Sequence, residues 1–504
     1  MNINTFLSTT REKLLKNVVW IIIGIGTIMR IAQYLYNRSL TEGEAALAIN
    51  IVQRSYTELF KPLDFAQAAP VGFLLLQKSL MNIMGNNELT LRLLPLVASI
   101  ASLFLFLDVA KKSISGKAIP IALILFTIGD HLIYFSSEIK QYSSDVTITL
   151  LLIFLGLTLL EKNFRMNCFI LFGVVGALSP WFSHPAVFTF YAVAAVLLFY
   201  LVRRRQRVRM TWLIFIGIIG TVSLSINYLV SLQTLSQHEG LLQVWSKSFM
   251  PLPPTSLADI QWFAYAFARI FKNPLGLFFY ELLLAVLSFL VGIIVLYSKK
   301  RRTVYMLLLP ILFALLASGF RKYPFQGRLL LFIAPLMFLL IAEGIYFIRH
   351  STAKNSNIIG IALVVILLIH PILLAGYHLI RPRAPEELRT VIYYLREHHE
   401  EGDCIYLYYA AQNAFRYYSD KLGFAEDEYI IGVEARDNWI NYYKDLEKLR
   451  GVQRVWIVFS HIATWGGVDE EKLFLSYLNI LGTPLDAFRA SGASAYLYNL
   501  SSNP

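Results

Sequence analysis

The chain lacks most features that would place it among soluble or metal-binding proteins. Charged residues make up 15% of its 504 positions, and its two cysteines are Cys168, in an apolar stretch, and Cys404, near the C-terminus. Cysteines so placed do not predict a disulfide. There is no internal repeat and no nucleotide-binding signature. No cluster of histidine, cysteine or acidic residues has metal-ligand spacing, so no cofactor is required, although a divalent metal ion is compatible with the sequence.

Long apolar stretches are abundant instead. Hydrophobic residues make up 56% of the chain, and the mean hydropathy is +0.55. Eleven stretches approach the roughly 20 residues that cross a ~30 Å hydrocarbon core. They are Val18–Tyr36, Leu89–Ala110, Ala118–Phe135, Val146–Leu160, Cys168–Phe182, Pro185–Val202, Trp212–Leu232, Leu275–Tyr297, Val304–Gly319, Leu329–Ile348 and Ile358–Tyr377. The sequence therefore predicts an α-helical polytopic membrane protein with about 11 transmembrane helices.

Basic residues fall in alternate loops between these stretches. They are Arg11, Lys13 and Lys16, then Lys111, Lys112 and Lys117, then Lys162 and Arg165, then Arg203–Arg207, then Lys299–Arg302, and finally Arg349 and Lys354. Because Lys and Arg accumulate in cytoplasmic loops, the N-terminus is expected inside and every other loop outside. This explains the net charge of +12 without nucleic acid. The first apolar stretch lacks a cleavage site, so it is expected to be a retained span.

Three outer segments are long enough to have structure of their own. In the first, residues 37–88, helical spacing over Ala45–Leu59 and a helical run over Pro70–Met84 predict two helices in the membrane interface. The second, Gln233–Pro274, has a helical pattern over Leu257–Phe271.

The third outer segment follows a transmembrane domain of residues 1–380. It alternates strand-like runs at Asp403–Tyr409, Arg454–Phe459 and Ala495–Leu500 with helix-like runs at Pro385–His398 and Glu470–Leu481. Residues 381–504 are therefore expected to form a small extracytoplasmic α/β domain.

Two carboxylates lie just after the first span. Thr41 and Glu44 have the spacing of a capping box, in which the threonine caps a helix and the glutamate reaches back. Glu44, or Glu42 beside it, could instead be a general base for an acceptor hydroxyl at the membrane surface. The two roles could exclude each other within one conformation, because a carboxylate bound to its own helix end is less free to act.

Other polar residues on the outer side are candidates for substrate binding. Gln67 could hydrogen-bond a sugar or phosphate, or be a solvated loop amide. Asp130 lies about 10 Å inside the outer end of its span, so it is expected to face the bundle interior, as a functional group or as a partner for a tyrosine or basic residue. Glu138, Lys140 and Tyr142 form a polar hairpin that ion pairs could stabilise or a ligand could occupy.

Two further turns carry candidates. His184 lies in a tight outer turn and could be a structural hydrogen-bonding group or part of the site. The last outer hairpin holds Arg321, Lys322, Tyr323 and Arg328, and its cations oppose the positive-inside bias. A lipid phosphate would explain them, because a guanidinium binds phosphate with two hydrogen bonds. Contact with ordinary headgroups is the alternative.

Four segments resemble motifs of membrane glycosyltransferases of the GT-C fold that use polyprenyl-phosphate sugars, chiefly the bacterial branch related to protein O-mannosyltransferases and lipid A aminoarabinose transferases. Glu44–Asn50 resembles the first-loop Asp-Glu segment, and Gln67–Pro70 with Asn86–Arg92 is similar to the end of that loop. Ser137–Tyr142 resembles the outer Glu-x-x-x-Tyr hairpin, and Tyr323–Arg328 the late arginine loop.

The resemblance implies an inverting transfer of a sugar from a polyprenyl-phosphate donor to a hydroxyl of a glycan, lipid or protein, at a bacterial inner membrane. It implies that Glu44 or Glu42 is the base. The donor phosphate would be held by Arg328 and Lys140, with Arg321 and Tyr323 near them. The expected substrate contacts are Gln67, Asp130, Glu138, Tyr142 and His184.

One departure leaves other functions open. Gly43 stands where the family has the aspartate most often assigned as base, which permits a weakened or non-catalytic member. A transporter or flippase of a lipid-linked or anionic substrate is the other alternative, but transporters usually show internal repeats.

Overall fold

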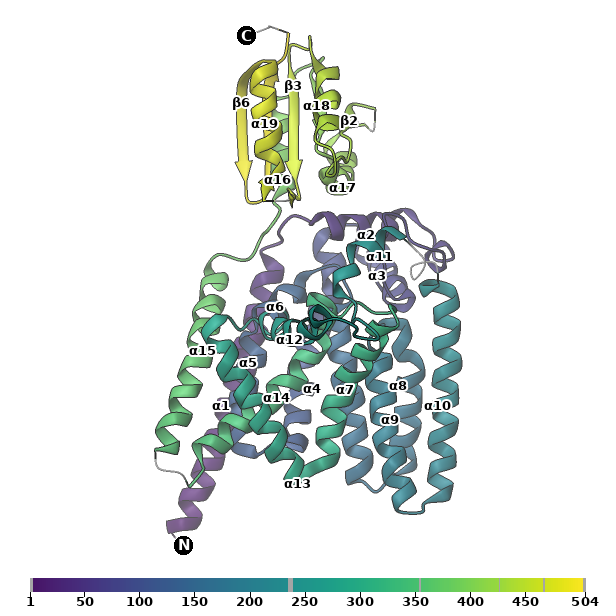
Figure 1. Ribbon diagram of the computed structural model, residues 1–504, viewed down its shortest axis with the longest axis vertical. Coiled ribbons are helices and arrows are strands. Elements are labelled where there is room, and N and C mark those ends of the chain that lie inside the picture. Colours follow the sequence, from purple (N-terminus) through teal and green to yellow (C-terminus); the bar gives the residue numbers. More distant parts are fainter. Residues whose placement is uncertain (1–2, 234–238, 353–354, 426, 466, 502–504) are drawn as a thin grey trace.

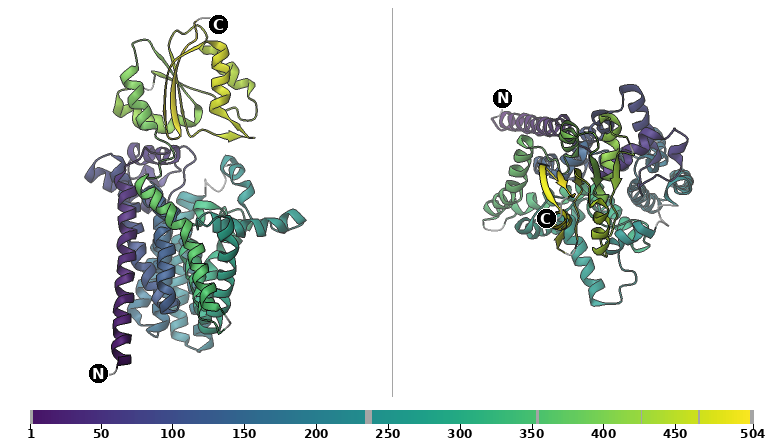
Figure 2. Two further views of the ribbon diagram at one scale, coloured as in Figure 1. Left: turned by 90° about the vertical axis from the view of Figure 1, so that its left-hand side faces the viewer. Right: turned by 90° about the horizontal axis from the view of Figure 1, so that it is seen from above.

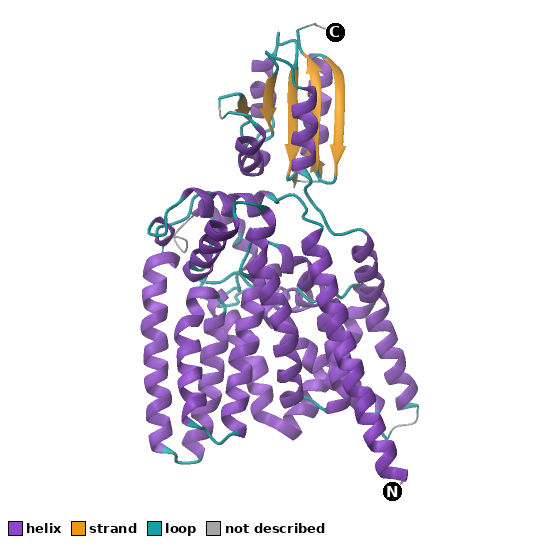
Figure 3. Cartoon of the chain, turned by 180° about the vertical axis from the view of Figure 1, so that it is seen from behind, coloured by secondary structure: helices purple, strands orange, loops and turns teal. Residues whose placement is uncertain are grey.

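The computed structural model describes residues 3–233, 239–352, 355–425, 427–465 and 467–501, with most side chains described from Asn17 onward. The predicted basic residues Arg11, Lys13, Lys16 and Lys354 lie outside the part with described side chains, as does the start of the predicted segment Gln233–Pro274. A helical bundle forms one part of the molecule, and a sheet with flanking helices stands above it (Figure 1). Strands are confined to that upper part (Figure 3).

The bundle and its connections contain these helices, where η marks a short or irregular one: α1 Ile3–Leu35, α2 Glu42–Gln53, η1 Glu58–Phe60, α3 Val71–Met84, α4 Glu88–Ser113, η2 Gly116–Ala118, α5 Ile119–Ile128, α6 Asp130–Tyr134, η3 Phe135–Ser137, α7 Tyr142–Glu161, α8 Met166–Phe182, α9 Ala186–Arg203, α10 Arg207–Asn227, η4 Tyr228–Leu232, α11 Glu239–Val244, η6 Ser246–Ser248, α12 Leu257–Lys272, α13 Phe279–Gly319, η7 Gly327–Ile333, α14 Ala334–Arg349 and α15 Ser356–Ile380. The predicted outer helices correspond to α2, α3 and α12, but α2 ends at Gln53, so the helix expected over Ala45–Leu59 is shorter than predicted.

The predicted count of about 11 spans differs from the number of helices that could cross a membrane. Among the described residues eight helices are long and apolar enough, or nine if a bent pair is one span. Leu275–Tyr297 and Val304–Gly319 share α13, whose backbone is non-helical at Lys300. Cys168–Phe182 lies in α8, which has only 17 residues. All the predicted spans are therefore helical. The count of eight treats α13 as one helix although it is broken at Lys300, and it leaves out the short helix α8 and the bent pair α5–α6.

The bent span is α5 followed by α6, with an angle of 55° between its halves. Arg30 of α1 is fully buried beside the break. Its guanidinium donates to the carbonyls of Thr127 at 3.2 Å and Phe126 at 3.4 Å, and its Nε donates to Ser99 at 2.8 Å. Carbonyls in the last turn of a helix lack intrahelical partners, so Arg30 satisfies groups that the break exposes.

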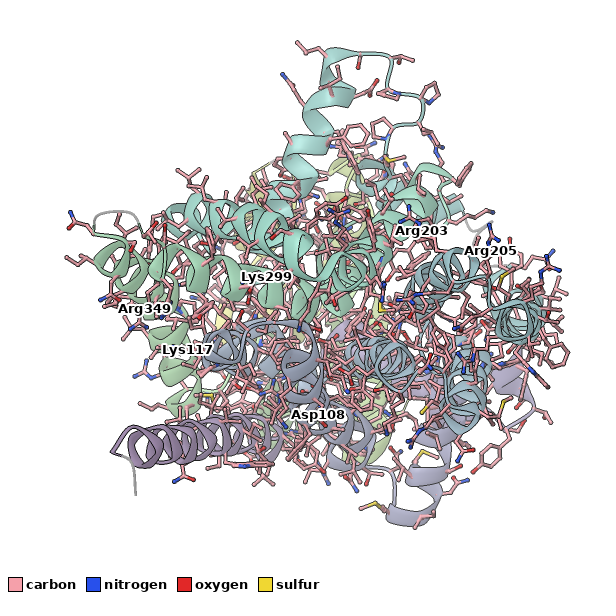
Figure 4. All side chains as sticks on the ribbon, turned by 90° about the horizontal axis from the view of Figure 1, so that it is seen from below. Asp108, Lys117, Arg203, Arg205, Lys299 and Arg349 are labelled. Atoms are coloured by element: carbon pink, nitrogen blue, oxygen red, sulfur yellow. The ribbon has the colours of Figure 1, made fainter. Side chains whose placement is uncertain are left out.

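The basic loops lie at the end of the bundle opposite the sheet. Figure 4 views this end, with Lys117, Arg203, Arg205, Lys299 and Arg349 spread across it. The N-terminal end of α1 projects on the same side (Figure 2). The chain is thus a multi-pass membrane protein with a basic end, and the positive-inside rule predicts that this end is cytoplasmic.

The upper part is a three-layer α/β/α unit. It contains β1 Cys404–Leu407, β2 Tyr429–Ile431, β3 Val455–Ser460, β4 Thr464–Trp465, β5 Val468–Asp469, β6 Thr483–Ala490, β7 Ala493–Asn499, α16 Leu388–His398, η8 Tyr409–Ala411, α17 Gln412–Leu422, α18 Ile440–Leu446, η9 Glu447–Leu449 and α19 Glu470–Leu481. The strand order is β2-β1-β3-β7-β6, parallel through β3 and antiparallel after it. Alternation along the strands buries one face with α16 and α17 and the other with α18 and α19. The predicted runs correspond to β1, β3, β7, α16 and α19.

The α/β unit is attached to the first outer segment by several hydrogen bonds. The Glu387 carboxylate accepts from Ser39, and the Tyr418 hydroxyl accepts from the Leu40 N–H at 2.8 Å. Arg389 pairs with Glu88 at 3.1 Å. Helix α17 packs on α2. The unit therefore covers the loop in which the candidate carboxylates lie.

Candidate active site

A buried cluster of charged side chains lies beneath the α/β unit, and Glu44 is at its centre with no exposed surface. Arg38 donates to Glu44 Oε2 at 2.5 Å, and Arg92 donates through Nε and Nη2 to Oε1 at 3.1 Å each. The Ile139 N–H donates to the same Oε1 at 3.0 Å. Glu44 therefore ties the first outer segment to α4 and to the hairpin before α7.

The capping box predicted from Thr41 and Glu44 is confirmed. The Thr41 side chain accepts from the Glu44 N–H, and the Thr41 N–H donates to Glu44 Oε2 at 3.1 Å. Burial raises the pKa of the Glu44 carboxyl, but Arg38 and Arg92 outweigh burial and hold that pKa below its usual range. Glu44 is therefore a weak base in this conformation, with both oxygens occupied by donors.

Glu42, the other predicted base, binds the α/β unit. Its carboxylate accepts from the Asn413 N–H at 3.1 Å and from the Ala414 N–H at 2.9 Å, both in the first turn of α17. Burial raises the pKa of Glu42 to about 7 in spite of these hydrogen bonds. In this arrangement Glu42 occupies N–H groups that the start of a helix leaves without partners.

The hairpin brings Glu138 and Lys140 to the same cluster. Lys140 Nζ donates to Gln67 Oε1 at 2.5 Å, which joins two residues predicted to bind substrate. Glu138 is 4% exposed. Burial and the neighbouring Glu44 carboxylate raise the pKa of Glu138, and the nearby cations only partly offset this. Among the described residues no side-chain hydrogen bond or ion pair engages the Glu138 carboxylate. Glu138 is therefore freer to accept a proton than Glu44 or Glu42.

Arg328 and Lys140, both predicted to hold a phosphate, lie in this neighbourhood. The Arg328 guanidinium carbon is 5.8 Å from the ring centre of Tyr142. Burial, followed by the Arg328 charge, lowers the pKa of Lys140 to about 8, against the opposing effect of Glu138. Lys140 is buried and Arg328 is exposed, and two neighbouring cations that destabilise each other are stabilised when an anion binds to both.

The other two residues predicted at the phosphate are placed differently. The Tyr323 hydroxyl donates to the Leu329 carbonyl at 2.6 Å, and its ring contacts Phe188 edge-on with the centres 5.1 Å apart. Arg321 is exposed in the turn after α13. Tyr323 therefore stabilises the hairpin locally, and Arg321 is available to headgroups at the surface.

Asp130 and His184 lie in other surroundings. The Asp130 carboxylate accepts from Arg383 Nη1 at 2.8 Å and lies 2.7 Å from His378 Nδ1, which matches the predicted alternative of a basic structural partner. His184 lies between α8 and α9, and burial lowers its pKa to about 4. No described residue hydrogen-bonds to its Nε2, so that nitrogen is an unused polar group.

Arg38 and Arg92 were not predicted as site residues. Each is at most 1% exposed, and together they neutralise Glu44. A signal was available, because both are cations beside the predicted outer face, where the positive-inside bias disfavours them. Within the described part of the chain, no group of three or more His, Cys, Asp or Glu side chains could hold a metal ion.

The chain has the GT-C fold, as predicted. No protein-family model matches the sequence, and no curated protein matches it. The likeness is therefore one of structure.

Two solved structures show the likeness. One is the archaeal oligosaccharyltransferase AglB from Archaeoglobus fulgidus, in complex with an inhibitory peptide and a dolichol-phosphate. It has a TM-score of 0.52 at 11% identity, covering 98% of this chain and 74% of AglB. The other is ArnT from Cupriavidus metallidurans bound to undecaprenyl phosphate, with a TM-score of 0.50 at 10% identity, covering 97% of this chain and 98% of ArnT. At these identities the similarity establishes the fold.

Proposed function

We propose that the protein is an inverting glycosyltransferase that moves a sugar from a polyprenyl-phosphate donor to an acceptor hydroxyl at the outer face of a bacterial inner membrane. The observation that carries the proposal is the buried Lys140 beside Glu138, with the exposed Arg328 guanidinium acting on both, within a GT-C fold. AglB and ArnT, which share the fold, hold a dolichol-phosphate and an undecaprenyl phosphate. The acceptor is a glycan, a lipid or a protein.

The charge balance of the cluster favours a phosphate ligand. Its cations are Arg38, Arg92, Lys140 and Arg328, and its carboxylates are Glu44 and Glu138. Arg38 and Arg92 form ion pairs with Glu44, whereas among the described residues no ion pair engages Lys140 or Arg328. These two cations are therefore available to form ion pairs with an anionic ligand. As the bond to the sugar breaks, negative charge grows on the leaving phosphate, where fixed cations stabilise the transition state.

We assign the base to Glu138, with Glu44 and Glu42 as the alternatives. Glu138 removes the proton of the acceptor hydroxyl as its oxygen attacks the anomeric carbon from the face opposite the phosphate. The bond from the anomeric carbon to the phosphate oxygen breaks, and the polyprenyl phosphate leaves with the electron pair. The raised pKa of Glu138 suits this role, because a base of higher pKa takes a proton more readily.

The test is sugar transfer from synthetic polyprenyl-phosphate donors in detergent. Glu138→Gln is expected to lower kcat by about 100-fold or more, with binding of undecaprenyl phosphate nearly unchanged. Arg328→Ala is expected to weaken that binding. Full activity of both variants would refute the site, and donor binding without transfer by the wild-type protein would favour the non-catalytic or transport alternatives.

The variant Gly43→Asp tests whether restoring the aspartate of the family's first loop raises sugar transfer. Apart from its own helix backbone and chain neighbours, nothing lies within 4 Å of a Cβ built at Gly43, so there is open space at this position for a side chain. If the protein uses Glu138, the variant changes transfer little. A large rise in activity would show instead that the missing loop aspartate limits the enzyme.

A further inference from the structure

A second polar site lies at the basic end of the bundle, opposite the Glu44 cluster. It is a cavity of about 1100 Å³ between α7, α9 and the turn within α13. Arg203, Arg204, Arg301 and Arg302 line it together with three lysines, and Glu161 is its only carboxylate among the described residues. Arg203 and Lys299 are labelled on this face in Figure 4. The cavity therefore carries a large excess of positive charge.

The arginines are held by aromatic rings and not by carboxylates. Arg302 and Arg204 both lie over Tyr200, at 4.1 Å and 5.6 Å from the ring centre. Arg203 lies 4.6 Å from the ring centre of Phe199, and Arg301 lies 5.1 Å from that of Tyr297.

The ion pairs at the cavity involve lysines, namely Lys112 with Glu161 and Lys299 with Glu343. Among the described residues none involves the four arginines. Stacking on a ring orients a guanidinium without using its N–H donors, so these donors are available to a ligand.

The positive-inside rule alone does not explain this arrangement. That rule requires only that cations lie in the loops, and Lys117, Arg205 and Arg349 meet it on the same face without lining the cavity. Bringing four arginines from two helices to one hollow costs electrostatic energy unless an anion is bound. Planar guanidinium groups match phosphate oxygens with paired hydrogen bonds, and the aromatic and aliphatic walls suit an attached apolar chain.

We propose that this cavity binds a phosphate-bearing anion, distinct from the sugar donor at the other end of the bundle. The phosphate comes either from the headgroup of an anionic lipid in this leaflet or from a soluble phosphorylated molecule. The site does not depend on the glycosyltransferase proposal, because no residue is shared between the two.

The test compares two charge-neutralising double variants. Arg301→Gln with Arg302→Gln removes two cavity cations, and Lys117→Gln with Arg205→Gln removes two cations of the same face outside the cavity. Each protein is placed in nanodiscs of phosphatidylcholine with or without phosphatidylglycerol. In detergent each is titrated with inorganic pyrophosphate, with sodium chloride at equal ionic strength as the control. Thermal melting and native mass spectrometry report binding.

We expect the cavity variant to bind about tenfold more weakly, the loss of roughly one charged hydrogen bond, while the control pair matches the wild type. A selective response to phosphatidylglycerol identifies a lipid, and one to pyrophosphate identifies a soluble phosphate. If Arg301→Gln with Arg302→Gln does not fold, Arg203→Gln with Arg204→Gln tests the opposite wall. No anion-selective response in the wild type, or equal losses in cavity and control variants, would overturn the proposal.

Discussion

The Glu44 carboxylate pairs with two buried arginines, and these ion pairs change the effect expected from its substitution. From spacing alone the capping box predicts that Glu44→Gln is nearly silent, because glutamine also fits that role. The ion pairs with Arg38 and Arg92 change this expectation, since a neutral side chain leaves two buried guanidinium groups without a countercharge.

We expect Glu44→Gln to destabilise the protein by roughly 3–5 kcal/mol, the usual cost of removing one partner from a buried ion pair. Thermal melting of the purified protein in detergent measures this effect. Thr41→Ala is the control, because it removes a cap contact and leaves both ion pairs, and it should cost only about 1 kcal/mol. Equal melting of Glu44→Gln and wild type would mean that the arginines have other partners.

The lowered pKa of Lys140 predicts that donor binding depends on pH. Its pKa is about 8 and rises when a phosphate binds, because the anion favours the ammonium form. Affinity for undecaprenyl phosphate should therefore fall about twofold between pH 7 and 8, and by up to about tenfold per pH unit above that. Lys140→Arg keeps its charge throughout this range and should show a flat profile. A flat profile for the wild type would remove Lys140 from the phosphate site.

At the scale of elements, the broken span α5–α6 depends on one side chain of another helix. A break inside a membrane exposes backbone carbonyls that water cannot reach, and such groups must find partners in the protein. Arg30 provides them from α1. The bend also starts α6 at Asp130, where its carboxylate meets His378 and Arg383.

Arg30→Met should destabilise the bundle by about 2–4 kcal/mol, because it leaves the Phe126 and Thr127 carbonyls unsatisfied. Arg30→Lys should cost less, since it retains one charged donor group. Melting in detergent distinguishes the three proteins. A stability order in which Arg30→Met exceeds the wild type would mean that desolvation of the buried guanidinium outweighs its hydrogen bonds.

Element type was predictable where the pattern is strong. Thr41 with Glu44 predicted the start of α2, and Pro70 predicted the start of α3, because capping and proline effects act within one turn. Strand β6 was missed, since its burial alternates along an exposed edge and its sequence includes Pro484. The break at Gly129 was also missed, because Arg30, which satisfies the carbonyls beside it, lies far away in the chain.

At the scale of the whole molecule, Glu42 couples the α/β unit to the bundle. Its pKa is raised to about 7 in the docked arrangement, mainly by burial, so the docked state binds a proton more tightly than an exposed glutamate does. Docking should therefore be strongest below pH 4.5, weaken as the pH rises toward 7, and then stay constant. The difference is at most about 3 kcal/mol.

Hydrogen exchange of α17, corrected for intrinsic rates, measures this coupling between pH 5 and 8. Glu42→Gln keeps an acceptor for the Asn413 and Ala414 N–H groups and should remove most of the dependence. A remainder is expected from His461, whose pKa is raised first of all by its hydrogen bond to Glu386. Protection that increases with pH in the wild type would contradict this role of Glu42.

Hydropathy and loop charge in the sequence were enough to determine a multi-span helical protein with a basic end, because crossing a bilayer requires apolar length and insertion responds to Lys and Arg. Only the tertiary structure decided how the charged side chains are used. Glu44 pairs with Arg38 and Arg92, Glu42 binds α17, and in the described part of the chain no side-chain hydrogen bond or ion pair engages the Glu138 carboxylate. These partners come from distant parts of the chain, and a carboxylate acts as a base or a clamp according to which donors packing brings to it.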